Sequence, residues 1–199
     1  MWMAAIQDPK AADVQIITWN DLSEGTEIEP ASATQFLFYD LSAYYTFWYK
    51  TGHPPAIRSD AIYYCSRTQD LAGAATGAQP ADRYHGIQVA TAVGPMKVLG
   101  QTPLVSNIEM VAFLTAPSRL EIAVAGRTFQ KDAGPGLAVL TVPAVAGRPL
   151  FRIVRAGAIV AQVEAHYAIA PAGAVPNLFY YGGSSNRPVV EMPINPRLH

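Results

Sequence analysis

Hydrophobic and polar residues follow two different patterns along the chain. Residues 14–19, VQIITW, form an apolar run with little alternation. Such a run is typical of a strand that is covered on both faces. Around residues 41–48 the apolar and aromatic side chains recur every three to four positions, at Leu41, Tyr44, Tyr45 and Trp48. That spacing places them on one face and predicts a helix.

The predicted helix has recognisable signals at both ends. Asp40 can cap its first turn, and Gly52 can end it, with Pro54 and Pro55 directly following. A strand, a long loop and a helix in this order are the local pattern of an α/β unit. The aromatic stripe on this helix could line a sugar cleft, but at helical spacing packing against a neighbouring element is favoured.

From residue 61 onward the pattern changes to short apolar stretches separated by turn residues. Several of them alternate, as in RLEIAVAG at 119–126, and glycine- or proline-containing turns lie between most of them. This arrangement predicts an antiparallel β-sandwich, with an irregular tail from residue 176 lying across it. The expected strands are 61–67, 86–93, 108–115, 119–126, 137–143, 150–157 and 158–169.

The first segment cannot form a parallel sheet by itself, because both faces and both edges of such a strand need cover. A complete (β/α)8 barrel needs about 250 residues. We therefore expect residues 1–55 to be the C-terminal end of a truncated (β/α)8 catalytic barrel, contributing its last strand and last helix. Residues 56–199 are expected to be the β-sandwich domain, so the chain should be mostly β overall.

Composition excludes several classes of protein. The 199 residues are 50% hydrophobic and 15% charged, with a net charge of −1, which excludes a disordered chain and gives no basic surface for nucleic acid or a membrane. No apolar run approaches the roughly 20 residues that span a bilayer. A single cysteine, Cys65, rules out an internal disulfide.

No cofactor or metal site is predicted, because none of the four histidines lies at ligand spacing from another donor. The N-terminal residues lack the basic region of a signal peptide, so the compartment stays open.

Four carboxylates lie within nine positions in the segment TWNDLSEGTEIEP, residues 18–30. In a barrel, residues just after a strand face the active site. Asp21 and Glu24 lie there, and glycoside hydrolysis requires two carboxylates that flank one bond. Their spacing allows roughly 5–10 Å between the carboxyl groups, so either stereochemical outcome is open. Trp19 is suited to stacking on a sugar and Asn20 to bonding a hydroxyl.

A second interpretation of these acids is purely structural. Acidic residues after a strand often cap the next helix or keep a loop solvated. The local pattern alone does not separate this role from catalysis.

Three stretches carry a resemblance to a known family: ITWNDLSEGTEIEP, then DLSAYYTFWYKTGHPPAI, then AIYYCSRTQ. Together they resemble the C-terminal portion of the α-1,3-glucanases, or mutanases, of glycoside hydrolase family 71. The later stretch IEMVAFLTAPSRLEIAVAG is also similar to the sandwich of that family. The piece EGTEIEP resembles the corresponding loop of the endo-α-mannosidases, a separate family with two acids at the same offsets.

The resemblance implies roles for the acidic pair. The family is regarded as inverting, which implies Asp21 as the general base that activates water and Glu24 as the general acid. It also implies an α-glucan as substrate and suggests a secreted protein. Because a lone strand and helix cannot hold two carboxylates rigidly, we expect the isolated chain to be inactive unless a partner supplies the missing N-terminal barrel portion. The alternative is a non-catalytic β-sandwich that binds carbohydrate or docks on another domain.

Overall fold

The computed structural model describes residues 2–22, 26–69, 106–171 and 179–191. Within them the chain is mostly β, as predicted, and two helices accompany two four-stranded antiparallel sheets. The predicted strand at 86–93 lies outside the described residues. The helices are α1 (Trp2–Gln7) and α2 (Leu37–Thr51), and the strands are β1 (Ala61–Arg67), β2 (Asn107–Leu114), β3 (Ser118–Val124), β4 (Arg127–Ala133), β5 (Gly136–Pro143), β6 (Leu150–Arg155), β7 (Ala158–Glu164) and β8 (Tyr180–Ser184).

The two sheets enclose a shared hydrophobic core. One sheet has the strand order β5-β2-β1-β8 and the other β4-β3-β6-β7. Inward-facing side chains of both sheets, such as Ile62 and Met110 from the first and Ile122 and Phe151 from the second, are fully buried in one cluster. The alternation seen in the sequence therefore marks the face of each strand that meets the other sheet.

Two short hairpins build the second sheet. The β3–β4 turn at Ala125 and Gly126 and the β6–β7 turn at Ala156 and Gly157 have positive φ at both central residues. This is the backbone of a type I′ turn, whose twist matches that of the paired strands.

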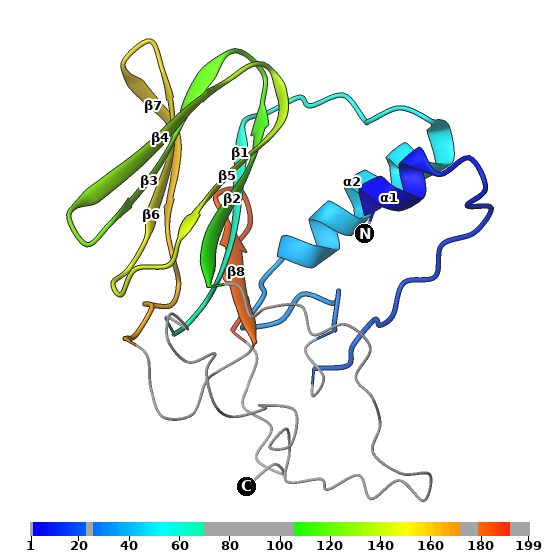
Figure 1. Cartoon of the computed structure of the whole chain (residues 1–199), viewed down its shortest axis with the longest axis horizontal. Helices are drawn as coiled ribbons and strands as arrows, with labels where there is room; N and C mark the ends of the chain where they lie inside the picture. The colour runs from blue at the N-terminus through cyan, green and yellow to red at the C-terminus, as the bar shows by residue number, and fades with distance from the viewer. Residues whose placement is uncertain (1, 23–25, 70–105, 172–178, 192–199) are drawn as a thin grey trace, which may run out of the picture.

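Helix α2 covers the outer face of the first sheet, so that the molecule has a helix layer and two sheet layers (Figure 1). Leu37 of the helix is buried against Tyr63 of β1 and Val111 of β2 in a second, smaller core cluster. α1 packs beside α2, and the connection from Gly52 returns over the top of the first sheet to β1 (Figure 1).

The expected strand at 14–19 is not formed. Among the described residues no β-ladder includes this segment, and Val14, Ile16 and Ile17 are exposed, Ile17 to 67%. In Figure 1 the segment after α1 runs on the side of the helices away from both sheets. A parallel strand needs neighbouring strands to satisfy its backbone, and none of the described strands lies beside it.

The helix was predicted correctly at its end but not at its start. Gly52 adopts the left-handed conformation with φ of 76° and donates its N–H to the Trp48 carbonyl, as a helix C-cap does. The first residue is Leu37, however, and no side chain caps it. Asp40, the expected cap, lies inside the helix and instead accepts hydrogen bonds from Tyr63 and Arg187.

Two edge strands were missed. β4 is mostly polar, and its charged residues protect a sheet edge from pairing with another chain. β8 lies in the tail expected to be irregular, yet it pairs with β1 through the register Cys65–Gly182. Its two consecutive glycines weaken the strand signal in the sequence.

Candidate functional site

The acidic loop, residues 18–30, is closed at its base by hydrogen bonds of its own backbone. The Thr18 N–H donates to the Thr26 carbonyl at 3.0 Å, and the Ile28 N–H donates to the Thr18 carbonyl at 3.2 Å. The Glu29 N–H donates to the Trp19 carbonyl at 2.8 Å. The two ends of the loop are therefore held together locally, although residues 14–19 have no strand partner among the described residues.

Asp21 lies within this closed loop and is partly exposed. Its backbone N–H donates to the Thr18 hydroxyl at 3.1 Å, and its carbonyl accepts from the Thr26 N–H at 3.3 Å. Glu24, the second predicted acid, lies outside the described residues. These bonds hold the Asp21 backbone near the start of the loop, at the surface of the protein.

The two predicted sugar-contacting residues are both at the surface. Trp19 is 51% exposed, and its ring meets the ring of Tyr39 edge-on at a centroid distance of 6.2 Å. Asn20 is exposed, and its carbonyl accepts from the Leu22 N–H at 2.9 Å. The loop thus presents an exposed indole and an exposed amide beside Asp21.

Glu27 is one of two acids in the run, with Glu29, for which the sequence predicted no role. It is only 5% exposed, and its Oε1 accepts a hydrogen bond from the Thr34 hydroxyl at 3.2 Å. Its Oε2 is also buried and has no hydrogen-bond partner among the described residues. Since a buried unpaired carboxylate oxygen is costly, Glu27 is an unusual residue for a solvated loop. Nothing in the spacing of the four acids distinguishes it from its neighbours.

The turn that buries Glu27 is tied to the C-terminal part of the chain. Gln35 donates from Nε2 to the Ser32 carbonyl at 2.6 Å, and its Oε1 accepts from the Val190 N–H at 2.6 Å. The return arm of the acidic loop, residues 26–30, therefore leads into a turn that is fixed directly before α2.

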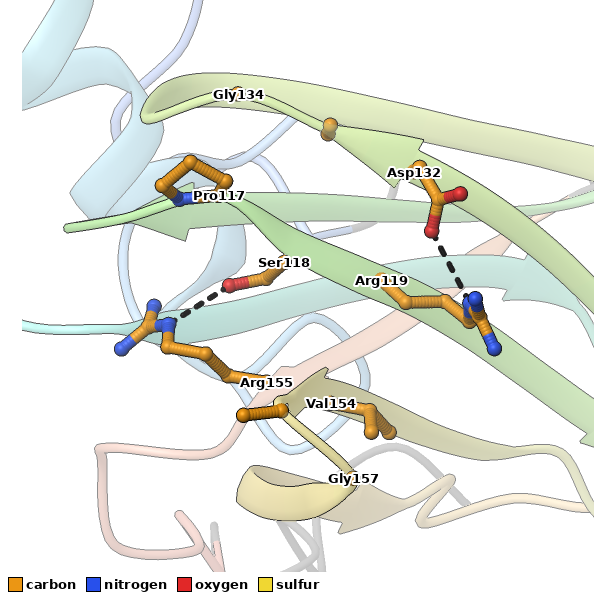
Figure 2. Close-up of a pocket in the computed structure, with 10 residues that line it drawn as sticks. Pro117, Ser118, Arg119, Asp132, Gly134, Val154, Arg155 and Gly157 are labelled. Carbon is orange, nitrogen blue, oxygen red and sulfur yellow. Dashed lines mark hydrogen bonds and ion pairs between the residues drawn. The ribbon is translucent and has the colours of Figure 1, made fainter.

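One concave surface lies at an end of the second sheet, as Figure 2 shows, and encloses about 590 Å³. Its charged side chains already have partners. Arg119 pairs with Asp132 at 3.0 Å, and Arg155 donates to the Ser118 hydroxyl at 3.1 Å (Figure 2). Arg155 also makes a bidentate ion pair with Asp60. These groups stabilise the ends of the strands, and none of the described site residues, Trp19, Asn20 and Asp21, lies there.

A second concave surface, which we call the aromatic groove, lies between the helices and the first sheet. It encloses about 650 Å³. Its lining residues come from α1, α2, the connection after α2, the end of β2 and the segment around β5: Met3, Tyr44, Tyr45, Trp48, Pro54, Pro55, Ile57, Leu114, Thr115, Pro135, Gly136, Leu137 and Val139. Of the predicted site, the described residues Trp19, Asn20 and Asp21 do not line this groove.

Within the described ranges, no group of three or more histidine, cysteine, aspartate or glutamate residues could hold a metal ion. No helix in the same residues is long and apolar enough to cross a membrane.

Comparison with known proteins gives one match. The model of the family described as glycosyl hydrolase family 71 matches residues 2–185, which include the acidic loop, α2 and all eight of the described strands. Searches of curated proteins and of solved structures found no match. Since the family match spans nearly the whole sequence, this chain belongs to glycosyl hydrolase family 71.

Proposed function

We propose that the chain is the C-terminal part of a glycoside hydrolase that cleaves α-glucan in the manner of an endo-α-1,3-glucanase. Membership of the family supports a glycoside hydrolase with a polysaccharide substrate. In the proposed arrangement residues 1–55 complete a (β/α)8 barrel, and residues 56–199 form a β-sandwich that packs against it.

The proposed chemistry uses Asp21 and Glu24 as the acid–base pair. In an inverting reaction one carboxylate accepts a proton from the attacking water, while the other protonates the leaving glycosidic oxygen on the opposite face of the sugar. We assign the first role to Asp21 and the second to Glu24. Trp19 would stack on a sugar ring, and Asn20 would bond a hydroxyl. The exposure of Trp19 and Asn20 beside Asp21, on a loop closed by its own backbone, supports this assignment.

The observation that carries the barrel proposal is the exposure of an apolar segment next to the site. Val14, Ile16 and Ile17 project side chains into solvent directly before the acidic loop, and no described strand pairs with them. A strand of a barrel would bury these side chains and bond its backbone on both edges. We infer that this segment becomes the last barrel strand when the rest of the barrel is present.

The isolated chain is proposed to be inactive for the same reason. Catalysis requires the reacting groups to be held within about 0.5 Å, and a segment without its sheet neighbours does not provide that rigidity. Turnover of α-1,3-glucan by the purified chain, abolished by Asp21→Asn, would contradict this part of the proposal.

The decisive experiment begins with the DNA upstream of the Met1 codon. An open frame that continues upstream identifies the longer protein, which should release reducing ends from α-1,3-glucan. Asp21→Asn and Glu24→Gln should each lower kcat by about 10²–10⁴-fold, the usual contribution of a general acid or base. An α-mannan assayed in parallel tests the mannosidase-like alternative. A stop codon directly upstream, or full activity of both variants, would refute the proposal.

A further inference from the structure

The aromatic groove contains a row of nearly parallel rings. Trp2 of α1 and Tyr45 of α2 have an interplanar angle of 13° and a centroid distance of 6.2 Å. Tyr45 and Trp48 repeat this relation, with 13° and 6.3 Å. Tyr45 and Trp48 line the groove itself, and Trp2 extends the row beyond it. The three rings are stacked, but at centroid distances of 6.2 and 6.3 Å they are offset, so that part of each ring face stays uncovered and can stack on the apolar face of a sugar ring.

Burial separates the rings that serve the core from those that remain available. Tyr44 is only 8% exposed, and its ring packs on Phe113 of β2 at 4.9 Å. Tyr45 and Trp48 lie on the same helix but are only half-buried. Of the aromatic residues of α2 that were predicted to pack, Tyr44 therefore fixes the helix to the sheet, while Tyr45 and Trp48 face the groove.

The polar groups of the groove suit a neutral, hydroxyl-rich ligand. No charged residue is among the described residues that line it. The described residues provide no hydrogen-bond partner for the Tyr45 hydroxyl or the Trp48 indole N–H. Burial first, and then the negative charge of Glu109, raise the pKa of Tyr45, so its phenol remains a donor at neutral pH. Two donors beside apolar walls are the usual means of orienting a small ligand.

The groove is also well separated from the acidic loop along the helix. The loop precedes Leu37 at the start of α2, whereas Trp48 lies in the last turns of that helix, about 16 Å further along its axis at 1.5 Å per residue. Its cavity of about 650 Å³ lies in the range of small-molecule sites.

From these features we propose that the aromatic groove is a second carbohydrate-binding site, which holds a segment of α-glucan chain on Tyr45 and Trp48 without cleaving it. The choice of α-glucan as the ligand rests on the proposed function. The site is built from the helices and the first sheet, so it requires no residue of a barrel active site. It would keep a polysaccharide chain attached while the acidic pair acts elsewhere on it.

The test is binding of an α-1,3-linked glucose oligosaccharide of about six units to the purified 199-residue chain, measured by calorimetry, with pull-down on insoluble α-1,3-glucan. Trp48→Ala and Tyr45→Ala should each weaken binding at least tenfold. Tyr45→Phe, which keeps the ring and loses the donor, should have a smaller effect. Phe47→Ala is the matched control, because Phe47 is an aromatic residue of the same helix, 44% exposed and outside the groove.

The outcomes distinguish this proposal from the enzymatic one. If Trp48→Ala fails to fold, as judged by circular dichroism, Tyr45→Ala and Tyr45→Phe still test the site. Wild-type affinity in both Tyr45→Ala and Trp48→Ala, or no binding of the oligosaccharide, would overturn the groove proposal. Neither result affects hydrolysis by the longer protein and its dependence on Asp21, and failure of that hydrolysis leaves groove binding standing.

Discussion

The packing of α2 on the first sheet depends on a glycine in the edge strand β8. A Cβ atom added at Gly182 would lie 2.6 Å from Cδ2 of Leu37 and 2.8 Å from the backbone oxygen of Tyr64. Carbon atoms in good contact are about 3.5–4.0 Å apart, so both neighbours would have to move. Leu37 is 2% exposed and the Tyr64 oxygen belongs to a central strand, which leaves little room for adjustment. We therefore expect Gly182→Ala to destabilise the chain through overpacking.

The size of the effect follows from the number of atoms that must shift. Overpacking by one methyl group costs about 1–3 kcal/mol, and a clash with backbone as well as side chain favours the upper part, about 2–3 kcal/mol. At about 2–4 °C per kcal/mol for a chain of this length, the Tm should fall by about 4–12 °C. Gly134→Ala is the matched control, because nothing lies within 4 Å of a Cβ there. It should change the free energy of unfolding by less than about 0.5 kcal/mol.

Thermal unfolding followed by circular dichroism measures both variants. A double-mutant cycle with Leu37→Ala identifies the cause, because removing the Leu37 Cδ2 creates the space that the new methyl group needs. The double variant should lose less than the sum of the two single variants, by about 1 kcal/mol. Equal Tm values for Gly182→Ala and Gly134→Ala would contradict the prediction, because they would show that the packing beside Gly182 can accommodate a methyl group.

Two further predictions concern titratable groups. Hydrogen bonds from the Arg155 guanidinium hold the pKa of Asp60 below its usual value, so this carboxylate stabilises the fold above its unfolded pKa of about 3.9 and the stabilisation is lost as pH falls through the lower folded pKa. Urea midpoints at pH 7 and pH 3 should therefore differ more for the wild type than for Asp60→Asn, and equal differences would contradict the assignment. Burial raises the pKa of Cys65 to about 12, so the native thiol should react with a disulfide reagent at pH 8 at least about a hundredfold more slowly than in urea. Similar rates in both conditions would show that the thiol is accessible.

The sequence predicted those features of the fold that depend only on residues close by in the chain. The end of α2 was predicted because Gly52 supplies the left-handed conformation that a C-cap requires. The start at Leu37 was not, because no polar side chain caps it and Asp40 is used in a tertiary ion pair with Arg187. β8 was not predicted, because Gly182 and Gly183 are poor strand residues. Glycine is needed at these two positions because Leu37 and Tyr64 lie too close for a larger side chain.

The sequence also left parts of the candidate site undetermined. The assignment of Trp19, Asn20 and Asp21 to an active site stays a prediction, and in the structure these residues are exposed or partly exposed. The burial of Glu27 could not be predicted, because it depends on the Thr34 hydroxyl across a turn. Spacing along α2 also places Tyr44 and Tyr45 on one face, and only the position of Phe113 decides which of them is covered.

The apolar segment before the acidic loop gives the strongest physical link between sequence and proposed function. A run such as VQIITW is favourable only where both faces and both backbone edges are covered, yet Ile17 and Trp19 are more than half exposed. The acidic loop beside it is nevertheless held by its own hydrogen bonds, and its return arm is fixed by Thr34 and Gln35. The local geometry around Asp21 therefore does not depend on strand pairing, whereas the placement of the whole loop against a substrate does. In the proposed enzyme, formation of the barrel would position a loop that is already closed at its base.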